Sequence, residues 1–473
     1  MAAVLRFATL GEQSFSADES FTVHLARMSF GGMLHQLPRS ESTPPLHYVL
    51  VWLWGQIFGT GEVGLRSLSA IAGTLTVPAV YATAREAFSR RAGVVAAALA
   101  TCSPILVWYS QEARSYALLA LLAAVGLYWF LRCLRAPSTR ALAAWGACAA
   151  LALCTHYFAL FVVGPEGAWL VWRARPRRSA LLACVPPLVC ILALAPLAYA
   201  QRHPSGGWSA KWTTPAASPL LVRLARIPRE LLLGYKVPAG PVLAVLVGLV
   251  LAWAVWRALR HSTAQVLLSI AFVGFAIPIA AALVSPGLDL VLSRFFLAAA
   301  VPVLVVAAGG LAESIRVGRL AVVVCCLVGL VMVGAVAADP AYQRPAIGAA
   351  ARALGPAIRT RFVVVTGEVA LAAQDYLAGS APADWTSGGR LQEVDVIAMP
   401  VAGAVDAPEL TRLGAPVPGF RLIERRSAGA YTVLRFTAER PRWVRFASLL
   451  PGFWRGWTAA ELGRPPQAGG LLQ

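Results

Sequence analysis

Two adjacent carboxylates near the start of the chain, Asp18 and Glu19, are the first residues whose types could do chemistry. They directly precede residues 20–30, which have a helical pattern, and acidic side chains at that position complement the helix dipole. A carboxylate can also act as a general base that takes a proton from a hydroxyl group. Adjacent residues do not share a helical face, so the two are not expected to act as a pair. These residues alone leave the structural and the catalytic interpretation open.

A denser polar cluster is Trp108-Tyr-Ser-Gln-Glu-Ala-Arg-Ser-Tyr116, in which Gln111, Glu112, Arg114 and Tyr116 lie within six positions. A simple turn would need only Gly, Ser or Asn. We therefore interpret the cluster as functional.

Two further polar residues lie in short motifs. Arg294 occurs in Ser293-Arg-Phe-Phe296, where a role in binding competes with simple snorkelling of the side chain to lipid headgroups. His156 occurs in Thr155-His-Tyr157, and a histidine in such a position is more often merely hydrogen-bonded than a ligand.

The composition identifies the environment in which these residues act. Of 473 residues, 58% are hydrophobic and 13% are charged, and the mean hydropathy is +0.66. These values exclude a disordered chain and a coiled coil, and they indicate a membrane protein. The net charge of +19 would also fit nucleic-acid binding, so the positions of the arginines decide between the two.

Ten apolar segments have about the ~17–25 residues that a helix needs to cross a bilayer, although two are short. They are residues 63–84, 92–109, 116–131, 141–155, 157–172, 179–200, 239–256, 264–284, 295–312 and 320–337. Fourteen arginines and only two acids occupy every second connector, which places those connectors in the cytoplasm by the positive-inside rule. Most of the positive charge therefore marks topology, and we expect no nucleic-acid partner.

The polar clusters then fall on the outer face of the membrane. The outward connectors are residues 11–61, 110–115, 201–238 and 285–294, together with everything after about residue 338. The connector 201–238 carries six basic groups against Glu230 and departs from the rule, but loops of this length still translocate.

Residues 46–58 are apolar, but a helix of this length rises only about 20 Å, short of the ~30 Å hydrocarbon core. We predict an interfacial helix on the outer face, with Tyr48, Trp52 and Trp54 at the headgroups. Residues 1–10 are too short to span, yet residues 11–61 have the character of an exported loop, which predicts a further helix upstream of the first residue.

The chain divides into a membrane domain, residues 1–340, and a soluble α/β domain, residues 341–473. In the latter we predict strands at 361–366 and 394–398, a helix at 369–377, and a hairpin over 421–436. An Arg/Trp-rich tail, residues 441–457, is typical of membrane-surface segments. The eight cysteines lie in or beside membrane segments and the histidines are dispersed, so the spacing predicts neither a disulfide framework nor a metal site.

The order of these motifs resembles the bacterial members of the GT-C membrane glycosyltransferases, in the protein-mannosyltransferase-like group that includes the lipid A aminoarabinose transferase. The motifs are Asp18-Glu19, Glu41-x-x-Pro44-Pro45-Leu-x-Tyr48, Glu62-x-x-x-Arg66, Tyr109-Ser-Gln-Glu-Ala-Arg-x-Tyr116, Thr155-His-Tyr157 and Ser293-Arg-Phe-Phe296. The resemblance covers roughly residues 10–340. It implies an all-α helix bundle with juxtamembrane helices over an outward cavity, with the α/β domain following it.

The resemblance also implies inverting transfer of a sugar from a polyprenyl-phosphate donor to a hydroxyl on a protein, lipid or glycan. A mannose-type sugar is the first candidate. Asp18 and Glu19 are then the catalytic candidates, with Asp18 as the base. The candidates for binding the donor phosphate and sugar are Arg114, Glu112, Gln111, Tyr116 and Arg294. The second-tier cavity candidates are Glu41, His47, Tyr48 and His156.

Arginines can neutralise the phosphate, so the chemistry requires no cofactor or metal, and a divalent metal stays open. The expected location is the plasma membrane, with the site on the extracytoplasmic face. Two alternatives are a transporter or flippase of lipid-linked substrates, for which polar residues at the midplane would be expected, and a non-catalytic membrane relative.

Overall fold

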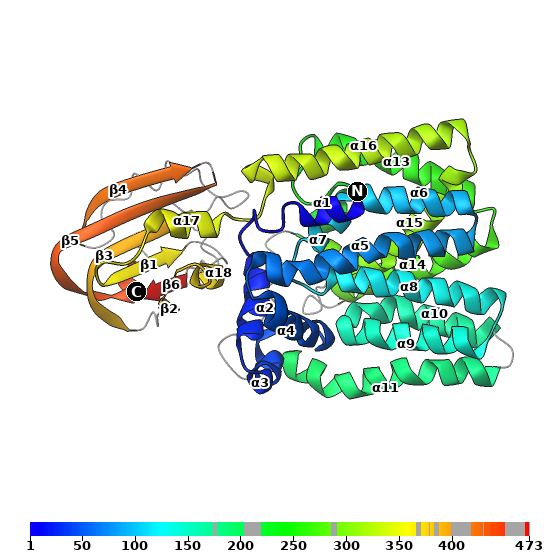
Figure 1. The fold of residues 1–473 in the computed structure, drawn as a ribbon, viewed down its shortest axis with the longest axis horizontal. Helices are drawn as coiled ribbons and strands as arrows, with labels where there is room; N and C mark the ends of the chain where they lie inside the picture. Colours follow the sequence, from blue (N-terminus) through cyan, green and yellow to red (C-terminus); the bar gives the residue numbers. More distant parts are fainter. Residues whose placement is uncertain are drawn as a thin grey trace. The chain divides into compact units, whose positions relative to one another are not determined.

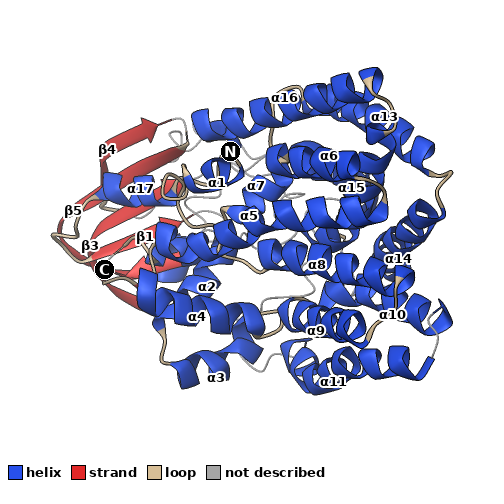
Figure 2. Cartoon of the chain, turned by 45° about the vertical axis from the view of Figure 1, so that its right-hand side comes forward, coloured by secondary structure: helices blue, strands red, loops and turns tan. Residues whose placement is uncertain are grey.

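The computed structural model describes residues 1–173, 177–202, 219–284, 291–365, 370–377, 379–382, 387–398, 418–428, 430–449 and 469–472. The chain forms two compact units (Figure 1). We refer to Met1–Leu10 with Thr22–Ala337 as the membrane unit, and to Gly11–Phe21 with Ala338–Gln473 as the C-terminal unit. The described part of the membrane unit contains helices only, and the described strands all belong to the C-terminal unit (Figure 2).

Helices occur at all ten segments for which the sequence predicted a span. They are α5 (Glu62–Ala87), α6 (Arg90–Cys102) with α7 (Pro104–Ser110), α8 (Tyr116–Arg135), α9 (Thr139–Thr155), α10 (Leu160–Arg173), α11 (Arg177–Arg202), α13 (Gly240–Ala258), α14 (Ser262–Val284), α15 (Leu297–Ala312) and α16 (Arg316–Ala338). Within the described ranges, seven of these segments are long and apolar enough to cross a membrane alone, and α6 with α7 makes an eighth. The protein is therefore a multi-pass membrane protein.

The break between α6 and α7 is a bend of 60°. Its cause is local, because Pro104 has no amide hydrogen and its ring clashes with a continuing helix, whereas proline is well accommodated as the first residue of α7. The bent helix leads directly into the polar stretch 111–115.

The core of the membrane unit lies around α15, which packs on α5, α6, α8, α13 and α14. Helix α15 and its preceding turn, Ser293–Phe296, form the most deeply buried of the candidate spans in the part of the chain described. Small residues allow this packing. A Cβ atom on Gly310 would lie 1.8 Å from the carbonyl oxygen of Ala254 on α13, so only glycine permits the approach.

Shorter helices cover the connectors that the sequence placed outside. The interfacial helix predicted for residues 46–58 is α4 (Leu46–Phe58). The helix expected at 20–30 begins three residues earlier, as α2 (Ala17–Arg27), because the cap lies further upstream. The sequence reasoning missed α3 (Phe30–Ser40) and α12 (Leu220–Leu233), and it did not anticipate the short α1 (Ala2–Phe7).

The C-terminal unit contains a six-stranded sheet with strand order β2-β6-β1-β3-β5-β4 in its described residues. The strands are β1 (Arg361–Val365), β2 (Ala381–Pro382), β3 (Gly388–Ala398), β4 (Arg421–Ala428), β5 (Tyr431–Arg445) and β6 (Gly469–Leu472), with helices α17 (Ile347–Leu354) and α18 (Ala370–Gln374). Strands β1 and β3 are parallel, and the remaining pairs are antiparallel. The predicted strands and hairpin are confirmed.

The structure differs from the sequence prediction for one helix and for the tail of this unit. Helix α18 falls within the predicted 369–377 but is shorter. Residues 441–445 of the expected membrane-surface tail are part of β5 and pair with β3, because they continue the hairpin strand. Residues 450–457 of that tail lie outside the described residues.

A row of buried charges crosses the centre of the sheet. Asp395 on β3 lies 3.4 Å from Arg361 on β1 and 3.3 Å from Arg435 on β5. Burial, with the neighbouring Glu393 adding to it, raises the pKa of Asp395 to about 7. The row joins three neighbouring strands through their side chains.

Candidate active site

Arg114, in the turn between α7 and α8, is the centre of a buried ion pair. Its Nη1 and Nη2 donate to Oε1 and Oε2 of Glu41 at 2.8 and 3.1 Å, and Nη1 also donates to Thr22 Oγ1 at 3.2 Å. The guanidinium carbon lies 5.9 Å from the ring centroid of Tyr48. Two parallel bonds to one carboxylate fix the guanidinium plane. Glu41, a second-tier candidate in the sequence reasoning, therefore orients Arg114.

Helix α4 brings His47 and Tyr48 to the same place, as its first turn follows Pro45. The Tyr48 hydroxyl lies 2.7 Å from Thr43 Oγ1, and His47 Nε2 donates to the carbonyl oxygen of Ala113 at 3.5 Å. Burial raises the pKa of Tyr48, so its hydroxyl stays protonated. The interfacial helix is thus docked on the turn that carries Arg114.

Gln111 contacts α1 and the residues that follow it. Its Nε2 donates to Thr9 Oγ1 at 2.8 Å and to the carbonyl oxygen of Leu5 at 3.2 Å. Beside it, the buried Arg6 donates to Ser110 Oγ at 3.2 Å and to the carbonyl oxygen of Ala100 at 3.0 Å. These contacts give Gln111 a structural task, which is to hold α1 against α7.

Arg294 lies in the turn before α15. Its guanidinium carbon lies 5.9 Å from the ring centroid of Tyr116 and 5.5 Å from that of Phe295. The ring of His156 lies 5.7 Å from Tyr116 and 5.5 Å from Phe295. The structure therefore brings together Arg294, Tyr116 and His156, three candidates from segments far apart in the sequence.

The sequence reasoning missed a polar network beside Arg294. Ser293 Oγ donates to Glu230 Oε2 at 2.7 Å and hydrogen-bonds the Tyr235 hydroxyl at 3.2 Å, and Tyr235 also hydrogen-bonds Tyr109. Burial raises the pKa of Tyr235, which keeps its hydroxyl available as a donor. The available signal was Glu230, the single acid in the basic connector 201–238.

Asp18 and Glu19 differ in their surroundings. Glu19 is fully buried and forms a capping box with Ser16. The backbone amide of Glu19 donates to Ser16 Oγ at 3.2 Å, and the backbone amide of Ser16 donates to Glu19 Oε2 at 2.9 Å. Its carboxylate also lies 3.7 Å from Arg344. Asp18 is half-buried. Glu19 therefore has a structural task at the start of α2, and Asp18 is the better candidate for chemistry.

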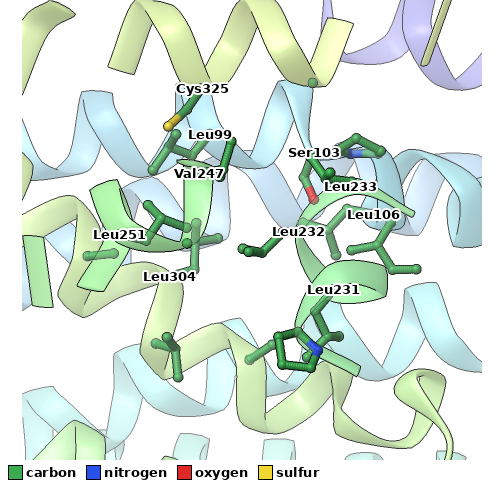
Figure 3. Close-up of a pocket in the computed structure, with 18 of the residues that line it drawn as sticks. Leu99, Ser103, Leu106, Leu231, Leu232, Leu233, Val247, Leu251, Leu304 and Cys325 are labelled. Carbon is green, nitrogen blue, oxygen red and sulfur yellow. The ribbon is translucent and has the colours of Figure 1, made fainter. Parts of the chain in front are cut away.

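An almost wholly apolar cavity of about 390 Å³ lies within the membrane unit. Leucines of α12, α13 and α15, among them Leu232, Leu251 and Leu304, project into it (Figure 3). Its wall includes Ile105 and Leu297, which pack in one cluster with Tyr109 and Tyr116. The cavity thus borders the aromatic side chains on which Arg294 rests.

The same architecture occurs in solved structures of ArnT from Cupriavidus metallidurans. The structure bound to undecaprenyl phosphate matches with a TM-score of 0.57 and 15% identity, covering 92% of this chain and 96% of that chain. The apo structure matches with a TM-score of 0.56 and 15% identity, covering 94% and 96%. The chain has the GT-C fold. At this identity, the likeness to these GT-C structures concerns the fold.

A protein-family model also matches about one third of the chain. The family described as dolichyl-phosphate-mannose-protein mannosyltransferase matches residues 42–199. This range contains α4, the 111–115 turn and His156. No curated protein sequence matches the chain.

Across the described ranges, no three His, Cys, Asp or Glu side chains are grouped to hold a metal ion. The guanidinium groups of Arg114 and Arg294 are suited to an anionic ligand.

Proposed function

We propose that the protein is an integral-membrane glycosyltransferase of the extracytoplasmic face. It transfers a sugar from a polyprenyl phosphate to a hydroxyl acceptor with inversion at the anomeric carbon, and a mannose-type sugar is the first candidate. The observation that carries the proposal is the junction of the arginine site with the apolar cavity. Arg294 rests on Tyr116, and Tyr116 packs in one cluster with Leu297 of the cavity wall. A polyprenyl phosphate has the matching form, an anionic head on a long apolar tail.

The arginines supply the electrostatics of the reaction. As the glycosidic bond breaks, negative charge collects on the departing lipid phosphate, and guanidinium groups that are already in place stabilise it without reorganising. Arg294 is the leading candidate for binding the phosphate because its guanidinium lies over the aromatic rings of Tyr116 and Phe295. The hydrogen-bonded hydroxyls of Ser293 and Tyr235 lie nearby. Arg114, held by Glu41, is the second fixed cation.

Asp18 is proposed as the general base that takes the proton of the acceptor hydroxyl as it attacks the anomeric carbon. On α2, Asp18 precedes Thr22 by four residues, and residues four apart share a helical face. Thr22 is the residue of α2 whose hydroxyl accepts from Arg114. Because the buried carboxylate of Glu19 is used in the cap of α2, Asp18 is the carboxylate that we assign as the base.

The experiment is transfer by the purified protein in lipid, with a panel of polyprenyl-phosphate sugars and detection of donor loss by mass spectrometry. Asp18→Asn should lower the transfer rate by about 10²–10⁴-fold while donor binding is retained. Glu12→Gln, which removes an exposed carboxylate of the same segment, is the matched control and should transfer normally. An unchanged rate in Asp18→Asn would refute the base, and movement of intact donor across the bilayer without transfer would favour a flippase.

A further inference from the structure

Two buried histidines beside the arginine site each leave one ring nitrogen without a hydrogen-bond partner. His47 on α4 is 1% exposed and His156, between α9 and α10, is 2% exposed. Among the residues that the structure describes, His47 Nδ1 and His156 Nε2 have no partner. Nearly all buried polar atoms in proteins are hydrogen-bonded, so two exceptions at one site call for an explanation.

The partnered nitrogens decide where the ring protons are. A carbonyl oxygen can only accept, so His47 Nε2, which bonds the carbonyl of Ala113 at 3.5 Å, carries the hydrogen. An amide can only donate, so His156 Nδ1, which accepts from the amide of Phe158 at 3.2 Å, carries none. The remaining atoms are then complementary, because His47 Nδ1 is an acceptor and His156 Nε2 is a donor.

Both rings are held in the neutral form. Burial lowers the pKa of His47 to about 3, and the positive charge of Arg114 acts in the same direction. Burial likewise lowers the pKa of His156 to about 3, with Arg114, Arg294 and His47 adding to it. The single-donor, single-acceptor arrangement therefore persists at every physiological pH.

The two rings lie next to the tyrosines on which the arginines rest. His47 contacts Tyr48, which Arg114 overlies, and His156 contacts Tyr116, which Arg294 overlies. A group bound by the imidazoles would thus be a close neighbour of a phosphate bound by the arginines. In a polyprenyl-phosphate sugar, that neighbour is the sugar itself.

We propose that His47 and His156 bind hydroxyl groups of the donor sugar, and that the donor carries a neutral hydroxylated sugar and not a protonated amino sugar. A hydroxyl both donates and accepts, so a sugar with several hydroxyls satisfies His47 Nδ1 and His156 Nε2 together. An ammonium group offers donors only, and it would be repelled by Arg114 and Arg294. A carboxylate would face the lone pair of His47. This inference rests on the proposed transfer from a polyprenyl phosphate.

The first test uses the wild-type protein in lipid with matched polyprenyl-phosphate donors. One set carries neutral hexoses or pentoses, and the other carries the same sugars with one hydroxyl replaced by an amine. The neutral sugar should have a kcat/KM at least about tenfold higher than its amino analogue, as expected from one buried hydrogen-bond mismatch. Equal or better transfer of the amino sugar overturns this inference but leaves the proposed function standing. No transfer from any donor overturns the proposed function, and this inference with it.

The second test assigns the histidines. His47→Phe and His156→Phe keep a flat ring but remove the polar atoms, and each should lower kcat/KM for the neutral donor by about ten- to hundredfold. His47→Asn and His156→Gln return an acceptor and a donor near the lost atoms and should restore part of the activity. His24→Phe, at an exposed histidine of α2, is the control.

A deoxy donor makes this assignment independent of protein stability. If a histidine binds a particular hydroxyl, the loss caused by its Phe variant should disappear with the donor that lacks this hydroxyl. An equal loss for every donor would mean that the histidine only supports the fold, and the proposal would be wrong.

Discussion

Replacement of Glu41 by glutamine tests the central ion pair of the site. The pair is almost fully buried, with side-chain exposures of 8% for Arg114 and 2% for Glu41. At a separation near 4 Å and an effective dielectric of 20, two unit charges attract by about 4 kcal/mol. Removal of one partner from a buried pair typically costs 3–5 kcal/mol, because the other charge stays buried without compensation. We therefore expect Glu41→Gln to lower the free energy of unfolding by about 3–4 kcal/mol.

The measurement is the free energy of unfolding in mixed micelles, followed by SDS titration, for Glu41→Gln, Arg114→Gln and the double variant. The double variant should lose less than the sum of the single losses, since the second change removes a charge that is already unpaired. Glu86→Gln is the matched control. Glu86 pairs with Arg135 at 3.4 Å, but the arginine side chain is 53% exposed, so the loss should be at most about 1 kcal/mol.

Activity provides a second readout of the same variant. Without Glu41 the guanidinium of Arg114 loses its fixed plane, and misplacement of a positioned charge should lower kcat/KM by about tenfold or more. If Glu41→Gln unfolds like the Glu86→Gln control and transfers normally, the ion pair neither stabilises the fold nor orients Arg114, and the reasoning is refuted.

Three further predictions concern packing, burial and pH. Gly329→Ala on α16 should destabilise by about 1–3 kcal/mol because the new Cβ would lie 2.2 Å from a backbone carbonyl of α6, whereas Gly334→Ala, with nothing within 4 Å, should be neutral or stabilising in the same SDS titration. Trp145→Phe should cost about 1–3 kcal/mol, because it removes the 2.8 Å bond from the indole to the buried Glu166 carboxyl; equal unfolding curves would contradict this. The raised pKa of Asp395, about 7 against about 3.9 in an unfolded chain, means that the folded C-terminal unit binds the extra proton between these values. Its stability should therefore fall as the pH rises from 4 to 7, and Asp395→Asn should flatten this slope in hydrogen exchange of β3 amides; a stability that rises over this interval would refute the assignment.

The sequence was sufficient for the features that depend on local composition. Each apolar run predicted a helix because a span must satisfy its own backbone hydrogen bonds in lipid. The 13-residue length of Leu46–Phe58 helped to separate it from the spans, and the structure has a helix with those bounds. The hairpin of β4 and β5 was equally local, because its two strands are joined by a short turn.

The pairing of side chains could not be predicted in this way. Glu41 and Arg114 lie 73 residues apart in the chain, and Ser293 meets Glu230 across 63 residues. Which carboxylate orients Arg114 depends on how α4 docks on the 111–115 turn, and no property of either segment alone contains that information. Helix α12 was missed although its amphipathic pattern is marked, because residues 201–238 were interpreted as a connector between spans.

The sequence by itself thus determined the solvent, the positions of the ten apolar helical segments, and the short list of residues with suitable chemistry. Only the tertiary structure decided what each residue on that list does. It assigned Glu19 to a helix cap and Gln111 to α1, and it gave His47 and His156 opposite hydrogen-bonding roles through single backbone contacts. The physical reason is that hydrophobicity acts along the chain, whereas hydrogen bonds and ion pairs form only between groups that packing has brought within about 3 Å.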